Sequence, residues 1–231
     1  MKRFASIALL VLVPLGVVSR SAYGTPMLRL TDGVTTINVT DQGVGDANSA
    51  VGAITFVGSI SPTSKWVFNV TTGVTKPVSG TAASPHMDVS TLNMTSMGPG
   101  TLTVQFTETG FGPLAANNSF RADIGGTTTS NGAIIYKTYL DSGNVGFAQT
   151  TLLTSQSFVG TPFSGTALSG AVSPANPYSL TEVLTITHTG AGQTSLDAEL
   201  QAVPEPSALL LLGSGLAGFG YLRMRRRTSV R

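Results

Sequence analysis

The stretch TLTVQFT, residues 101–107, decides the fold class of this 231-residue chain. Leu102, Val104 and Phe106 alternate with polar residues, most of which are threonine. Successive side chains of a β-strand point to opposite faces, so this period of two predicts a strand with one apolar and one polar face. Threonine suits the polar face because it is β-branched and can form hydrogen bonds across neighbouring strands. The stretch therefore predicts an antiparallel sheet that buries one of its sides.

Four further segments show similar alternation. Three of them carry one apolar face each: WVFNV at residues 66–70, EVLTITH at 182–188 and SLDAELQ at 195–201. The fourth, AIIYKTYL at residues 133–140, has large side chains at both odd and even positions, which predicts a strand covered on both faces.

Turn signals separate these segments, at Asp32-Gly33, Thr109-Gly110, Asn131-Gly132 and the DSGN run at 141–144. The stretch 157–179 is rich in Gly, Ser and Pro and is either a long loop or strands joined by wide turns. Short strands with frequent turns predict a single all-β domain, an antiparallel β-sandwich. A β-solenoid is the alternative, but the chain shows no fixed repeat period, which counts against it.

Both ends of the chain have the composition of targeting segments. Residues 1–24 begin with Lys2 and Arg3, continue with an apolar core and end in small residues, which is the pattern of a cleaved signal peptide. An uncleaved anchor is the alternative, because Arg20 lies close to the cleavage site. At the other end, an almost uncharged apolar run at 207–222 would reach about 24 Å as a helix, slightly less than a hydrocarbon core of about 30 Å. The sequence predicts a single transmembrane helix there.

The basic residues that follow this run set its orientation. Arg223, Arg225, Arg226 and Arg227 should remain in the cytoplasm with a short tail at 228–231, because flanking segments obey the positive-inside bias. The domain at residues 25–202 then lies outside the cytoplasm.

Without its ends the chain is acidic. The full sequence has a net charge of +2, but residues 25–203 contain five basic and ten acidic residues, a net charge of −5. Nucleic-acid binding is excluded as an expectation, because it needs clustered Lys and Arg. The chain has no cysteine, so disulfides and thiolate chemistry are absent.

The C-terminal segment resembles a PEP-CTERM sorting signal, residues 203–227. The matching residues form the Pro-Glu-Pro element and the basic cluster: Val203, Pro204, Glu205, Pro206, Arg223, Arg225, Arg226 and Arg227. The resemblance implies export by the Sec machinery from a Gram-negative bacterium and recognition by an exosortase in the membrane. It also implies that the C-terminal helix anchors the chain in the inner membrane before processing, and that the chain is afterwards at the cell surface or extracellular. The same segment is sometimes called an ice-binding protein C-terminal domain, a label that carries no activity.

A second resemblance covers residues 28–108, which are similar to the opening of exported PEP-CTERM proteins without an assigned activity. It includes LRLTDGVTTINVTDQGVGDANSAVGAITFVGSI and KWVFNVTTGVTKP. Together the two resemblances imply a non-enzymatic surface or extracellular-matrix protein that works with exopolysaccharide in a biofilm. A carbohydrate-binding module is the alternative, and a secreted hydrolase using His86, His188 or an acidic pair is the third hypothesis.

Two candidate ligand sites follow from side-chain chemistry. Asp41, Asp46 and Asn48 place oxygen ligands on a Gly-rich loop that could hold Ca²⁺, although a turn between two strands explains the same residues. No other cofactor is expected.

The aromatic residues give the second candidate site. Trp66, Tyr136 and Tyr139 could stack on sugar rings, with packing in the core as the alternative for Trp66.

Overall fold

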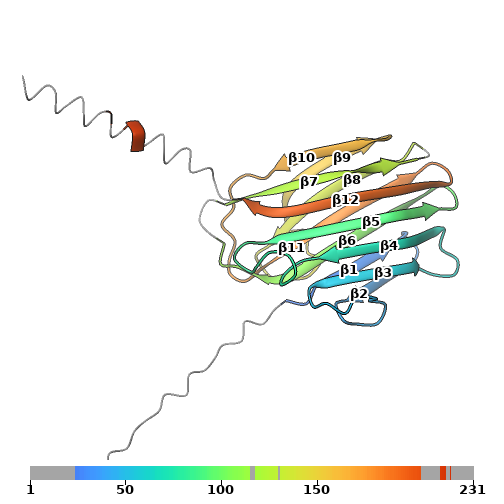
Figure 1. Ribbon diagram of the computed structural model, residues 1–231, viewed down its shortest axis with the longest axis horizontal. Helices are drawn as coiled ribbons and strands as arrows, with labels where there is room; N and C mark the ends of the chain where they lie inside the picture. Colours follow the sequence, from blue (N-terminus) through green and yellow to red (C-terminus); the bar gives the residue numbers. More distant parts are fainter. Residues whose placement is uncertain (1–23, 115–117, 130, 204–213, 217–218, 220–231) are drawn as a thin grey trace, which may run out of the picture.

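The computed structural model describes residues 24–114, 118–129, 131–203, 214–216 and 219. Residues 24–203 form two six-stranded antiparallel sheets packed face to face, so the predicted all-β sandwich is confirmed (Figure 1). The predicted signal peptide, apart from Gly24, lies outside the described residues. The same holds for the membrane segment, apart from residues 214–216 and 219. No helix in the described part of the chain is long and apolar enough to cross a membrane.

The first sheet has the strand order β2-β1-β6-β11-β8-β9. Its strands are β2 (Thr36–Thr40), β1 (Met27–Thr31), β6 (Gly100–Phe111), β11 (Tyr178–His188), β8 (Ala133–Asp141) and β9 (Thr151–Val159). The second sheet has the order β10-β7-β12-β5-β4-β3. Its strands are β10 (Phe163–Leu168), β7 (Ser119–Thr128), β12 (Gly192–Val203), β5 (His86–Ser96), β4 (Trp66–Val74) and β3 (Ala53–Ser59).

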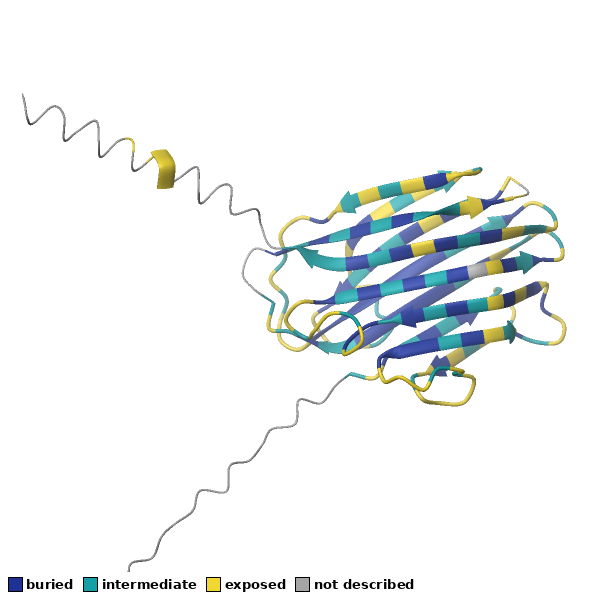
Figure 2. Cartoon of the chain, viewed as in Figure 1, coloured by how far each residue is buried: buried dark blue, intermediate teal, exposed yellow. Residues whose placement is uncertain are grey.

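The TLTVQFT stretch lies in β6, a central strand of the first sheet. Leu102, Val104 and Phe106 are at most 1% exposed and face the second sheet. Bands of buried and exposed residues alternate along the strands (Figure 2), as the period of two predicts. The core lies between the sheets and includes side chains from strands of both.

The core also contains a buried ion pair that the alternation did not predict. Lys76 Nζ lies 2.6 Å from Glu108 Oε1, and both side chains are at most 2% exposed. Lys76 also donates to the Thr109 carbonyl and lies 3.9 Å from the centre of the Phe111 ring. Burial lowers the pKa of Lys76 and raises that of Glu108 to about 7. This charged pair lies at one end of the core. The alternation of Leu102, Val104 and Phe106 alone would place an apolar residue at position 108.

Two expectations about local structure are wrong. Thr109-Gly110 is not a turn: both residues lie inside β6, where Gly110 has a φ of 72° and the pairing with β11 shifts between Tyr178 and Leu180. Glycine there allows a bulge, because it adopts positive φ without strain. The other error concerns β8, which is not covered on both faces.

The outer face of β8 is open because its neighbours there are polar. Ile135 is 37% exposed and pairs with Ser157 of β9 and Thr185 of β11. For the stretch 157–179 the second alternative is confirmed, since it contains the end of β9, all of β10 and the start of β11.

Candidate functional site

The two ends of the sandwich contain different parts of the chain. Ser96, at the end of β5, pairs with both Trp66 and Gly192, so the start of β4 and the start of β12 lie at one end. β12 then runs the length of the sheet, and Val203 pairs with Ser119 at the opposite end, where the chain continues toward its C-terminus (Figure 1). Twelve residues of strand separate the two ends by roughly 40 Å.

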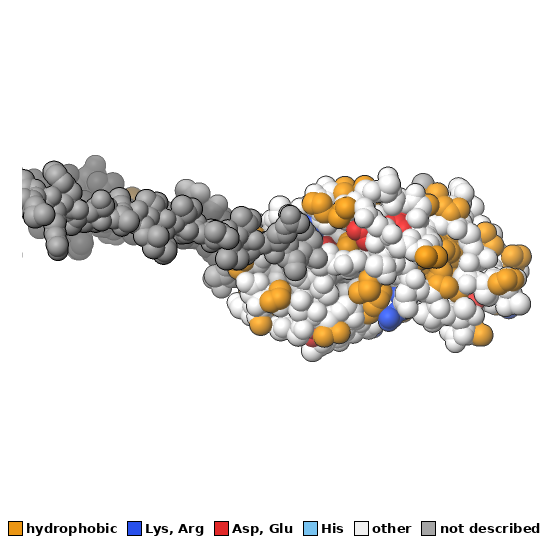
Figure 3. All heavy atoms as spheres, turned by 90° about the horizontal axis from the view of Figure 1, so that it is seen from below, with side chains coloured by type: hydrophobic (Ala, Val, Ile, Leu, Met, Phe, Trp, Pro, Cys, Tyr) orange, Lys and Arg blue, Asp and Glu red, His pale blue; other side chains and the backbone are white. Residues whose placement is uncertain are grey.

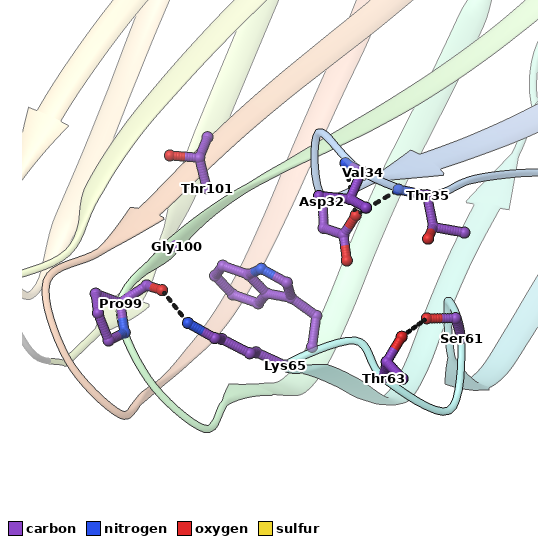
Figure 4. Close-up of a pocket in the computed structure, with 10 residues that line it drawn as sticks. Asp32, Val34, Thr35, Ser61, Thr63, Lys65, Pro99, Gly100 and Thr101 are labelled. Carbon is purple, nitrogen blue, oxygen red and sulfur yellow. Dashed lines mark hydrogen bonds between the residues drawn. The ribbon is translucent and has the colours of Figure 1, made fainter.

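A cavity of about 230 Å³ opens at the end where β12 begins. We call it the loop-end cavity. Its walls come from the β1–β2 turn, the β3–β4 loop and the β5–β6 turn (Figure 4). The lining residues are Asp32, Val34, Thr35, Ser61, Thr63, Lys65, Trp66, Pro99, Gly100 and Thr101.

Trp66 lines the loop-end cavity, yet it is only 2% exposed. Its ring packs on the His188 ring, with centroids 5.1 Å apart. The prediction that Trp66 offers a stacking platform is therefore wrong, because almost none of the ring surface is accessible. Packing in the core, the stated alternative, describes most of the side chain.

His188 packs against the Trp66 ring and is itself held by two hydroxyl groups. His188 Nδ1 lies 2.7 Å from Ser96 Oγ, and Nε2 lies 2.8 Å from Thr194 Oγ1. Burial lowers the pKa of His188, so the ring is neutral at pH 7. This histidine is 1% exposed and has no route to a substrate in this conformation.

Asp32 joins two walls of the loop-end cavity. Its Oδ1 accepts the N–H groups of Val34 and Thr35, and its Oδ2 accepts the Ser64 hydroxyl at 2.9 Å. The Thr35 N–H is the largest cause that holds the pKa of Asp32 below its usual value. Ser64 Oγ in turn accepts the backbone N–H of Trp66. This chain of hydrogen bonds fixes the position of Trp66 relative to the β1–β2 turn.

Lys65 spans the rim of the loop-end cavity. Its Nζ donates to the Pro99 carbonyl at 3.4 Å and so links the β3–β4 loop to the β5–β6 turn (Figure 4). The sequence pattern did not indicate Lys65 or Asp32 as site residues. Asp32-Gly33 was recognised only as a turn, and no local signal shows that three separate turns meet.

The two tyrosines proposed as sugar contacts do not accompany Trp66. Tyr136 is fully buried, and its hydroxyl donates a 2.5 Å hydrogen bond to Glu182 Oε1. The prediction for Tyr136 is wrong, because the ring lies between the sheets. Tyr139 is half-buried on the outer face of β8 and is not among the residues that line the loop-end cavity.

Most side-chain oxygens of the loop proposed for Ca²⁺ accept hydrogen bonds within the protein. Asp41 Oδ2 accepts the N–H of Gly52, whereas the buried Asp41 Oδ1 has no hydrogen-bond partner among the described residues. Asp46 Oδ1 accepts the N–H groups of Asn48 and Thr55, and its Oδ2 accepts that of Gln42. Asn48 Oδ1 accepts the N–H of Ala50. No group of three or more acidic or histidine side chains among the described residues is arranged to hold a metal. The geometry fits the alternative interpretation, in which Asp46 and Asn48 shape a turn between β2 and β3.

A second concavity, of about 390 Å³, crosses the outer face of the second sheet. Asp123, Asp197 and Glu199 line it, together with Gly125 and Gly165. Asp88 is paired with Glu199 across the strands, and burial raises the pKa of Asp88 to about 6, with Asp197 adding to the rise. We call this surface the acidic groove.

His86 lies at the edge of the acidic groove. The Ser79 hydroxyl bonds to its Nδ1, and its Nε2 lies 2.9 Å from Glu199 Oε1. Ser, His and Glu thus form a chain of contacts at a half-exposed surface, which the histidine version of the hydrolase hypothesis could use.

The sorting signal begins before the second sheet ends. Val203 is the last residue of β12, and Ala202 donates its N–H to the Pro85 carbonyl. The remaining residues predicted for this signal, Pro204 to Pro206 and the arginines at 223–227, lie outside the described residues.

The family of PEP-CTERM protein-sorting motifs matches residues 202–227. The chain therefore carries an exosortase sorting signal and is an exported protein. No curated protein matches the chain.

Solved structures give only distant likenesses. The carbohydrate-binding module TmCBM61, in complex with β-1,4-galactotriose, is 12% identical, covers 62% of this chain and 90% of its own, and has a TM-score of 0.32. A cleaved adhesin domain of Lys-gingipain from Porphyromonas gingivalis is 11% identical, with coverages of 69% and 95% and a TM-score of 0.31. The enzymatically active domain of a bacteriophage tailspike protein is 9% identical, with coverages of 75% and 19% and a TM-score of 0.30. Such values are too low to transfer a ligand or an activity.

Proposed function

Given an exosortase sorting motif at residues 202–227, we propose that this chain is a non-enzymatic protein of the cell surface or extracellular matrix that works with extracellular polysaccharide. The observation that carries the proposal is that the sorting segment and the loop-end cavity lie at opposite ends of the domain. The sorting segment continues from β12 at one end, and the loop-end cavity opens at the other. A domain held by its C-terminus would present that cavity away from the membrane.

The surface supports a role in binding more than in self-association. Exposed large apolar side chains include Val34, Val44, Val159 and Leu168. On the face seen in Figure 3, apolar side chains lie in small separate groups among uncharged polar ones. Contiguous apolar patches mark protein interfaces, whereas a polar surface with a concavity suits a hydroxyl-rich polymer.

A gene deletion tests the proposal directly. We expect the deletion strain to show altered biofilm or floc texture, and the full-length gene to restore it. The Ser79→Ala variant should restore it equally, because the proposed role needs no nucleophile. Unchanged texture in the deletion strain would contradict the proposal.

An activity assay of the purified domain provides a second test of the proposal. We expect no turnover of ester or glycoside substrates above the uncatalysed rate. Ester hydrolysis that Ser79→Ala and His86→Ala both abolish would replace the proposal with the hydrolase hypothesis.

A further inference from the structure

The indole N–H of Trp66 has no hydrogen-bond partner among the described residues. The side chain is 2% exposed, but Nε1 is not one of the fully enclosed polar atoms that lack a partner. The small remaining surface of Trp66 therefore includes this nitrogen, and the residue lines the loop-end cavity. Buried indole N–H groups normally find an acceptor, so an oxygen atom entering the cavity would complete this one.

Gly100 leaves room for that oxygen. A Cβ atom at residue 100 would lie 3.5 Å from Trp66 Nε1, in ordinary contact. Any side chain at this position would stand over the N–H, and glycine keeps it open.

The walls of the loop-end cavity favour a neutral ligand with many hydroxyl groups. Hydroxyls come from Thr35, Ser61, Thr63 and Thr101. Ser61 and Thr63 share one hydrogen bond and Thr101 shares one with Thr187, which leaves each hydroxyl further capacity to donate or accept. The charged groups balance, because one carboxylate and one ammonium line the cavity. The Asp32 oxygens already accept hydrogen bonds from the protein, and Lys65 is held at the rim by Pro99. A ligand with a net charge would find no unopposed partner there.

We propose that the loop-end cavity binds a single neutral sugar residue at the end of a glycan chain, with the Trp66 N–H donating to one of its hydroxyls. The cavity of about 230 Å³ is below the range of roughly 300–1,000 Å³ typical of larger ligands, which suits one ring. This inference rests on the proposed function and names the ligand class of the polysaccharide role. In this inference the edge of the Trp66 ring donates a hydrogen bond to the sugar, in place of the stacking on the ring face that the sequence suggested.

Intrinsic tryptophan fluorescence reports on this site alone, because Trp66 is the only tryptophan in the chain. We expect titration of the purified domain with the methyl glycosides of glucose, galactose and mannose to change its intrinsic fluorescence, with a saturable curve for at least one. Glucosamine and glucuronic acid should bind at least about tenfold more weakly than the best neutral glycoside, since each adds an unpaired charge. A charged sugar that binds more tightly would overturn the inference.

Two matched glycine substitutions test whether the sugar binds at Trp66 Nε1. Gly100→Ala places a methyl group against Nε1 and should weaken binding about fivefold or more. Gly190→Ala, in the β11–β12 turn where an added Cβ atom would meet nothing within 4 Å, should bind like the wild type. Equal affinity of the two variants would contradict the assigned site.

Trp66→Phe keeps a large ring and removes the N–H, so ligand-observed NMR should show weaker binding by a similar factor. Its far-UV spectrum and unfolding midpoint establish that it still folds. If none of the neutral glycosides binds, the cavity holds water only and the inference is wrong.

Failure here is distinguishable from failure of the proposed function. A deletion strain whose texture Gly100→Ala restores fully would leave the matrix role intact and remove the loop-end cavity from it.

Discussion

Glu182 lies on the inner face of β11, fully enclosed between the sheets, where the Tyr136 hydroxyl donates to its Oε1 at 2.5 Å. Burial raises its pKa well above the ordinary value of 4.5, and the negative charges of Asp88, Glu199 and Asp197 add to the rise. The hydrogen bond from Tyr136 opposes this rise only in part. Glu182 is therefore protonated under conditions in which an exposed glutamate is ionised.

The stability of the fold should depend on pH through this residue. Because the folded pKa is raised, its contribution is fully present below the unfolded value of 4.5 and is lost as pH rises through the folded pKa. Glu182→Gln keeps an acceptor for Tyr136 and cannot ionise. We expect the variant to gain stability relative to the wild type as pH rises from 5 to 9, by about 1–3 kcal/mol. Urea unfolding at each pH measures this, and a difference that does not change with pH would contradict it.

β4 and β6 belong to different sheets and interlock at one glycine. A Cβ atom on Gly73 of β4 would lie 2.6 Å from the ring of Phe106, which is fully buried. Glycine is needed here for close approach, since the ring of one sheet enters the surface of the other. Burial of such a ring stabilises the fold by about 1.5–3 kcal/mol.

Gly73→Ala should therefore destabilise the domain. The added methyl group must displace a ring that has no free space, which costs about 1–3 kcal/mol. Chemical denaturation of Gly73→Ala and of the control Gly190→Ala measures the difference. Equal midpoints for the two variants would show that the sheets adjust without cost.

The loop between β8 and β9 explains burial that the alternation alone does not predict. Ser179 and Thr181 are on the outer face of β11 but are fully buried. The Ser179 hydroxyl donates to the Val145 carbonyl, and the N–H of Phe147 donates to Thr107 Oγ1. The loop thus lies across the first sheet and covers a face that the sequence predicts to be open.

At the scale of the whole molecule, folding and sorting are separable along the chain. Val203 completes β12, whereas the Pro-Glu-Pro element follows it. We expect truncation after Val203 to change the free energy of unfolding by less than about 0.5 kcal/mol, because no described contact of the sandwich is removed. The same truncation should abolish retention at the surface, measured by cell fractionation.

A substitution at full length separates the two effects. Pro204→Ala combined with Pro206→Ala should mislocalise the protein while leaving its unfolding midpoint unchanged. Normal surface retention of both the truncated and the substituted chains would show that the motif is not used.

Much of the fold could be predicted because strand alternation is a local property. TLTVQFT, WVFNV, EVLTITH and SLDAELQ all lie in strands, and most of their apolar residues are in the core, whereas Val67 is 37% exposed. Gly110 was misread because the same residue serves turns and bulges, and only the pairing of β6 with β11 distinguishes them. The loop-end cavity was missed because its residues come from three turns separated by about thirty residues each, and no local pattern connects them.

The sequence by itself determined the fold class, the acidic character of the domain and the sorting motif, because each depends on residues near one another in the chain. The tertiary structure alone decided the strand order, the burial of Lys76, Glu108 and Glu182, and the role of Trp66. These depend on which turns and faces meet when two sheets pack. Trp66 shows the difference most clearly, since its alternation predicts a core residue and only the meeting of three turns leaves its N–H open.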